Sequence, residues 1–175
     1  MHGNLRGIVM ESNVIAAMLL LILGTGSMGC AQSPQPRILR NDAVLEAWLT
    51  CEECTNGELE AIVRAGQSMV SPLAEALRAG PTQDTLDGTR RRLTGAYQSM
   101  VEYAKTHPDA PVPMSEREYV DRHLENFIVM YQSHAATGLG AIGGAAAKDE
   151  LTKASALPLR QPVLTVVRET LQRLQ

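Results

Sequence analysis

The chain has 175 residues, enough for one globular domain once a targeting segment is set aside. Aromatic residues make up only 3% of the sequence, which disfavours a β-sandwich built from aromatic and β-branched residues. The formal net charge of −3 excludes a global basic field of the kind that attracts nucleic acid, so we expect no nucleic-acid partner.

The first thirty residues have the layout of a secretory signal peptide. An apolar run at residues 14–24 is about half the length that a helix needs to cross a bilayer. Arg6 precedes this run and small residues follow it, although Glu11 is unusual in a region that is normally positive. We therefore predict export to the cell envelope, with residues 1–30 as the signal peptide and cleavage near Cys30.

Cys30 raises the possibility of a lipid anchor. The segment Ser27-Met28-Gly29-Cys30 resembles a bacterial lipoprotein signal, in which the cysteine is lipidated and becomes the mature N-terminus. Ser27 stands where leucine is usual, so ordinary cleavage nearby, for example after Ala31, stays open. Residues 31–40 are polar and contain two prolines, which predicts a flexible tether between the N-terminus and the folded domain.

Residues 41–175 begin with three short segments that carry helix start and stop signals. The first helix is predicted from Asn41 or Asp42 through Leu49. The second and third are delimited by a capping box, glycines and a proline. We expect the second helix at residues 58–65, between the Thr55/Glu58 capping box and Gly66. We expect the third helix from near residue 69 to residue 78, just before Gly80.

The middle of the chain predicts two longer helices separated by a proline-rich loop. One begins at Thr82 or Asp84 and ends at His107-Pro108, and the loop covers residues 108–114. The other follows a second capping box and either extends to residue 142 or breaks near residue 138. Short helices at 145–154 and 162–174 complete the chain, and no alternating stretch is long enough to predict a strand.

Two segments of the chain share a helix–turn–helix pattern. Alignment of residues 59–77 with residues 137–154 places Gly66 over Gly144 at the turn and Leu73 over Leu151 in the second helix. Short apolar helices that recur in pairs cannot bury their faces alone, which is typical of a stacked helical solenoid.

The clearest copy of this pattern, residues 135–151, resembles the HEAT-repeat family, including its bacterial branch related to phycobilisome-lyase repeats. A helix of small residues there ends in Ile142-Gly143, and a second helix follows directly. Residues 66–77 and the last helix resemble the repeat too, whereas residues 82–130 depart from it. The resemblance implies an all-α domain at 41–175, a short α-solenoid of HEAT-like helical hairpins with an irregular central pair of longer helices, and a scaffold function.

The segment Cys51-Glu-Glu-Cys54 is the most distinctive local motif. Cysteines three apart on a helical turn can be bridged with modest distortion, and oxidation is the default in an exported protein. We therefore predict a structural disulfide at the junction between the first two helices. A catalytic redox pair is the less favoured alternative, because no strands flank the motif and the two glutamates disfavour a thiolate.

A zinc site at the cysteines would need two more ligands. His107, His123 and His134 lie far along the chain and show no metal-ligand spacing, so we expect no metal and no cofactor. Zinc binding and a reduced, inert pair nevertheless stay open.

Two other charged clusters favour solvated helix faces. The run Arg90-Arg91-Arg92 fans out around a helix, and Asp87 is placed to pair with Arg90 and Arg91. Asp121, His123 and Glu125 are spaced two apart, so their side chains point away from each other on a helix, which favours a solvated face over an acid–base pair.

These features together predict a non-catalytic, extracytoplasmic scaffold or interaction module that presents a helical surface to a protein partner. A lipid on Cys30 would attach the module to a membrane. The main alternative is a thiol–disulfide or metal-handling protein that uses Cys51 and Cys54. A lyase-like or peptide-processing enzyme is a second alternative, against which the lack of a catalytic constellation argues.

Overall fold

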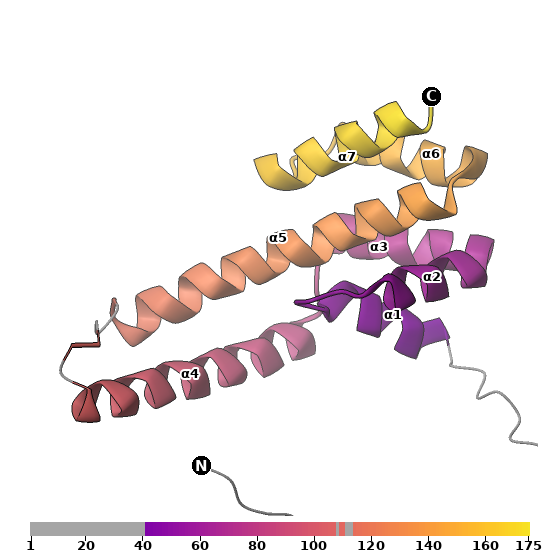
Figure 1. Cartoon of the computed structure of the whole chain (residues 1–175). Helices are drawn as coiled ribbons and strands as arrows, with labels where there is room; N and C mark the ends of the chain where they lie inside the picture. The colour runs from indigo at the N-terminus through magenta and orange to yellow at the C-terminus, as the bar shows by residue number, and fades with distance from the viewer. Residues whose placement is uncertain (1–40, 108, 111–113) are drawn as a thin grey trace, which may run out of the picture. The chain divides into compact units, whose positions relative to one another are not determined.

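The computed structural model describes residues 41–107, 109–110 and 114–175 (Figure 1). This part of the chain is all-helical and contains no strand, which confirms the predicted fold class at that level. The predicted signal peptide, the tether and Cys30 lie outside the described residues. The helices belong to one compact unit.

Three short helices open the domain: α1 (Asn41–Thr50), α2 (Asn56–Ala65) and α3 (Val70–Ala79). The predicted capping box precedes α2, because the backbone N–H of Thr55 donates to the Glu58 carboxylate at 2.9 Å. Gly66, with φ of +60°, ends α2. A 3-10 turn (Gly66–Met69) then leads into α3, which therefore begins at Val70.

Two long helices follow, α4 (Gln83–Thr106) and α5 (Glu116–Ile142). The side chains of Thr82 and Ser115 cap their N-termini by accepting bonds from the backbone N–H groups of Thr85 and Glu118. Of the two outcomes that the sequence left open, the structure shows α5 continuing through Gly138. A Cβ at that position would lie only 3.0 Å from Trp48 Nε1, so glycine there allows α1 to approach α5.

The chain ends with α6 (Gly144–Ala154) and α7 (Gln161–Arg173), which has Pro162 in its first turn. Helix α5 is central: it packs against α1, α2, α3, α4, α6 and α7 (Figure 1). The fully buried side chains gather around its C-terminal half and the short helices: Leu49, Ile62, Met69, Leu73, Leu77, Leu139, Leu151, Val163 and Val167.

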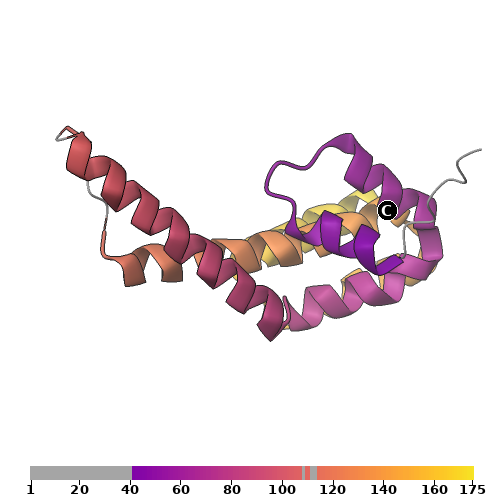
Figure 2. The same cartoon turned by 90° about the horizontal axis from the view of Figure 1, so that it is seen from below.

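Helix α4 is much less well covered than these short helices. It packs chiefly against the N-terminal half of α5 and runs at an angle to it (Figure 2). Thr89 is the one residue of α4 that is buried. Its apolar side chains are only partly buried: Leu86, Leu93, Tyr97, Met100, Val101 and Ala104. Within the described ranges, no helix combines the length and the apolar character required to span a bilayer.

Candidate functional site

Cys51 and Cys54 lie in the connection between α1 and α2, where they form a disulfide with their Cα atoms 5.2 Å apart. The motif was expected on a helical turn, but residues 51–55 lie outside both helices because α1 ends at Thr50 and the cap of α2 is Thr55. Cys51 is half-buried and Cys54 is exposed. The disulfide therefore presents one sulfur to the core and the other to solvent.

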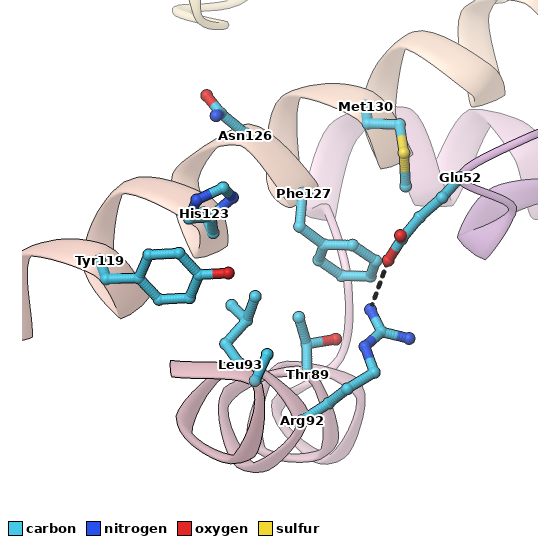
Figure 3. Close-up of a pocket in the computed structure, with 10 residues that line it drawn as sticks. Glu52, Thr89, Arg92, Leu93, Tyr119, His123, Asn126, Phe127 and Met130 are labelled. Atoms are coloured by element: carbon cyan, nitrogen blue, oxygen red, sulfur yellow. Dashed lines mark hydrogen bonds and ion pairs between the residues drawn. The ribbon is translucent and has the colours of Figure 1, made fainter. Parts of the chain in front are cut away.

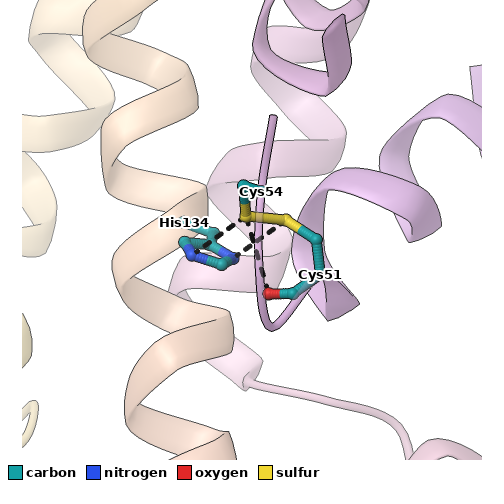
Figure 4. A group of neighbouring side chains, drawn as sticks. All are labelled: Cys51, Cys54 and His134. Atoms are coloured by element: carbon teal, nitrogen blue, oxygen red, sulfur yellow. Dashed lines mark hydrogen bonds between the residues drawn. A yellow bond between two sulfur atoms is a disulfide. The ribbon is translucent and has the colours of Figure 1, made fainter. Parts of the chain in front are cut away.

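The structure places a histidine against this disulfide (Figure 4). His134, on α5, has its Nδ1 3.9 Å from Cys51 Sγ and its Nε2 3.6 Å from Cys54 Sγ. In the sequence His134 lies 80 residues beyond Cys54 and shows no metal-ligand spacing, yet the fold places it beside the cysteines. The packing of α1 on α5 brings the three side chains together.

Trp48 holds this part of α5 in place. Its indole Nε1 donates a 2.8 Å hydrogen bond to the backbone carbonyl of His134, and the two rings lie 4.9 Å apart between centroids. Burial lowers the pKa of His134, and hydrogen bonds to the backbone of Leu49 and Trp48 oppose that shift in part. Burial therefore favours the neutral imidazole, the form that can act as a metal ligand.

The acidic residues between the cysteines are not equivalent. Arg92 of α4 forms an ion pair with Glu52 at 2.9 Å, and both side chains are more than half exposed. The sequence suggested that Glu52 and Glu53 together place negative charge beside the cysteines and so disfavour a thiolate. In the structure the charge of Glu52 is offset by Arg92, and the pair ties the cysteine-containing connection to α4.

A groove of about 530 Å³ lies between α4 and α5, directly beyond this ion pair (Figure 3). Leu93 of α4 and Phe127 and Met130 of α5 provide apolar surface. Glu52 and Arg92 lie together at one end. The groove therefore combines an apolar lining with charged groups, which is typical of a binding surface.

The other charged clusters separate in the structure. Arg90 pairs with Asp87 at 3.0 Å, whereas Arg92 reaches Glu52, so the arginine run does not form one patch. Asp121 and Glu125 are exposed and have different cationic partners, Arg117 and Arg160 respectively. His123 instead lines the groove, with its ring 4.3 Å from that of Tyr119.

A signal in the sequence could have indicated that His134 faces the protein. Phe127, Tyr131, His134 and Gly138 follow each other at helical spacing, and Phe127 and Gly138 are buried. That spacing places His134 on the inner face of α5, although it does not say which side chain it meets. No family model, curated protein or solved structure matches this chain. Its function is therefore inferred from the contacts described above.

Proposed function

We propose that residues 41–175 form a non-catalytic, HEAT-like interaction module that binds an apolar segment of a partner protein in the groove between α4 and α5. The observation that carries this proposal is the groove itself. Its apolar side chains, Leu93, Phe127 and Met130, lie beside a charged end. Burial of such surface against a partner is favourable at roughly 25 cal/mol per Å² before the costs of association.

The packing of the short helices supports the HEAT-like part of the proposal. Helices α2 and α3 form one consecutive pair, and the C-terminal half of α5 forms another with α6. The first helices of the pairs contact each other, α2 with α5, and so do the second, α3 with α6. Helix α7 then packs on α5, as the first helix of a further repeat would.

The incomplete burial of α4 supports the choice of this face for binding. A helix of 24 residues normally buries an apolar stripe, yet Thr89 is the buried residue of α4. Tyr103, near its end, is 58% exposed. A partner segment lying along α4 and α5 would cover the partly exposed apolar side chains, as a helix does in a hydrophobic groove.

Two variants test the groove: Leu93→Glu on α4 and Met130→Lys on α5, both at partly buried positions. The matched control is Lys148→Glu, at an exposed position on α6 outside the groove. Crosslinking capture from extracts of the source cells identifies a candidate partner, which is then purified and titrated. We expect each groove variant to weaken the Kd at least about tenfold, or ~1.4 kcal/mol, and the control to leave it unchanged.

Circular dichroism establishes that each variant keeps its helical content before its Kd is compared. Partner binding that survives both groove substitutions would overturn the assignment of this surface. Loss of binding in the Lys148→Glu control would overturn it as well, because that change is remote from the groove.

The proposed extracytoplasmic location is supported by the apolar run at residues 14–24 and by the cysteine at position 30. Mass spectrometry of the mature N-terminus distinguishes the two forms of processing. A protein that begins at Cys30 and carries acyl chains supports membrane anchoring through that residue. An unmodified N-terminus near residue 32 supports simple secretion, and an intact Met1 contradicts cleavage of a signal peptide.

Thiol–disulfide exchange is the second candidate function, and the position of His134 beside an exposed sulfur favours it. A thiolate of a substrate dithiol would attack Cys54 Sγ, and Cys51 would leave as a thiolate. The second substrate thiolate would then release the reduced protein and an oxidised substrate, so that two electrons pass to the disulfide.

This second function is measured as oxidation of a dithiol peptide by the oxidised protein. The matched control is a synthetic peptide of residues 48–57, which has the same cysteines without the fold. Exchange at least about tenfold faster with the protein than with the control peptide supports activation by the fold. Equal rates would show that the disulfide has only a structural role.

A further inference from the structure

We propose that Cys51, Cys54 and His134 bind one Zn²⁺ ion once a dithiol has reduced the disulfide. This site goes beyond the proposed partner binding and does not depend on the groove. Two of its ligands come from the connection between α1 and α2, and the third comes from α5 (Figure 4). The same residues would thus form a disulfide under oxidising conditions and a metal centre under reducing ones.

The separations of the three side chains fit zinc. One ligand atom from each residue can be chosen so that all lie within 4.8 Å of one another, and Cys54 Sγ lies 3.6 Å from His134 Nε2. In a tetrahedral site with Zn–S bonds of about 2.3 Å and Zn–N bonds of about 2.0 Å, a sulfur and a nitrogen lie about 3.6 Å apart. The spacing between Cys54 Sγ and His134 Nε2 therefore needs little change.

The two sulfurs must move apart for the metal to enter. In a tetrahedral zinc site two sulfurs lie about 3.8 Å apart, so the S–S bond must first be broken. The spacing Cys-x-x-Cys is typical of cysteine pairs that bind one zinc ion. Because residues 51–55 lie outside α1 and α2, the sulfurs can separate without unwinding either helix.

The surroundings supply the rest of a metal site. The indole of Trp48, whose ring centroid lies 4.9 Å from that of His134, helps to orient the imidazole, as outer contacts orient metal-bound histidines. Cys54 is exposed, so a water molecule can reach the fourth coordination position. Glu53, next to Cys54, adds negative charge near the incoming cation.

The chemistry balances in two steps. A dithiol gives two electrons and two protons to the disulfide, becomes a disulfide itself, and leaves Cys51 and Cys54 as thiols. Zn²⁺ then replaces the two thiol protons, which are released to solvent, and the two thiolates neutralise the charge of the ion. His134 binds through one neutral ring nitrogen and loses no proton.

The experiment uses the purified mature protein, reduced with a phosphine that has no thiol to compete for metal. Zn²⁺ is titrated in competition with a chromogenic chelator, and Co²⁺ is used as a spectroscopic probe. We expect one equivalent of metal and a thiolate-to-cobalt charge-transfer band in the reduced protein, and neither in the oxidised protein. The double variant Cys51→Ser/Cys54→Ser should lose both.

Variants of His134 separate the proposed site from chelation by the two cysteines alone. We expect His134→Asn to weaken zinc binding at least about tenfold, whereas His134→Cys should retain it by supplying a third sulfur. The matched control is His107→Asn, at an exposed position at the end of α4, which should bind zinc like the unmodified protein. If His134→Asn unfolds, His134→Cys and the cobalt spectrum still test the third ligand.

Unchanged affinity in a folded His134→Asn variant would overturn the proposal, and so would equal binding by the oxidised protein. The groove variant Leu93→Glu makes the two proposals distinguishable. It should weaken partner binding and leave zinc binding unchanged, whereas His134→Asn should weaken zinc binding. If no partner binds in the groove, the proposed zinc site is therefore unaffected, and if no zinc binds, the proposed groove is unaffected.

Discussion

Position 140 shows how one missing side chain lets two helices approach. A Cβ at Gly140 of α5 would overlap the Cγ2 atom of Thr170 on α7. Thr170 is buried, with 4% of its surface exposed, and a β-branched side chain in a helix has few alternative rotamers. The contact between α5 and α7 is therefore matched to glycine at this point.

We predict that Gly140→Ala lowers the free energy of unfolding by about 1–3 kcal/mol, because the added methyl group forces Thr170 or the whole of α7 to shift. Urea denaturation measures the change. Thr170→Ala in the same chain should recover part of the loss by removing the overlapping atom.

Gly95→Ala is the matched control for this prediction. Gly95 also lies inside a long helix, but a Cβ there would meet no atom within 4 Å. Alanine should therefore stabilise α4 by up to ~1 kcal/mol through its higher helix propensity. Similar effects of the two substitutions would contradict the close approach at position 140.

At the scale of elements, polar links join helices that the apolar core already packs together. Buried Gln132 of α5 donates a 2.9 Å hydrogen bond from Nε2 to the carbonyl of Leu77, near the end of α3. Glu150 of α6 pairs with Arg78 of α3 and also with Lys153 on its own helix. These links fix how α3 lies against α5 and α6.

The Glu150 carboxylate should make stability depend on pH. Hydrogen bonding to Lys153, and then to Arg78, lowers the pKa of Glu150 below its ordinary value of 4.5, while burial opposes the shift. The folded state therefore binds this proton less readily than the unfolded state. The stabilisation is fully present above pH 4.5 and is lost as the pH falls through the lower pKa of the folded state.

We predict that Glu150→Gln lowers the free energy of unfolding by roughly 0.5–1 kcal/mol at neutral pH. The difference from the unmodified protein should shrink as the pH falls below 4.5 and vanish below the lowered pKa of the folded state, where the carboxyl group is protonated in both states. Glu60→Gln is the control, because its 3.5 Å pair with Arg64 lies within α2 and joins no helices. A difference that persists at low pH would rule out the ionic explanation.

At the scale of the whole folded unit, burial is distributed unevenly. The short helices and the C-terminal half of α5 contain the fully buried side chains, whereas α4 is covered on one side only. Buried apolar contacts determine how much free energy is needed to open a segment locally. Local opening of α4 should therefore cost less free energy than local opening of the helices around the core.

We predict that hydrogen exchange, measured by mass spectrometry of peptide fragments, is faster in α4 than in α3, α6 and α7. In the presence of a partner that fills the groove, α4 should become protected. Exchange that is equally slow in α4 and α3 would show that α4 is as stable as the core, and would weaken the case for an open binding surface.

The helices were largely predictable because their boundaries depend on local chemistry. The capping boxes at Thr55 and Ser115 precede α2 and α5, and glycines at 66 and 143 with positive φ end α2 and α5. The expected boundaries differ from the observed ones by one or two residues. The continuation of α5 through Gly138 was not decided by sequence, because it depends on Trp48 and Leu73 packing against that glycine.

What the sequence by itself determined is therefore the helical character of the described part of the chain and the order of its helices, whereas for the two cysteines three residues apart it favoured a disulfide without excluding a reduced or zinc-bound pair. Only the tertiary structure decided that His134 lies at the disulfide, that Arg92 meets Glu52, and that a groove opens between α4 and α5. The physical reason is how far apart in the sequence the interacting residues lie. Caps, turns and helical periodicity act within a few residues, whereas these contacts join residues 40 to 83 positions apart through the packing of whole helices.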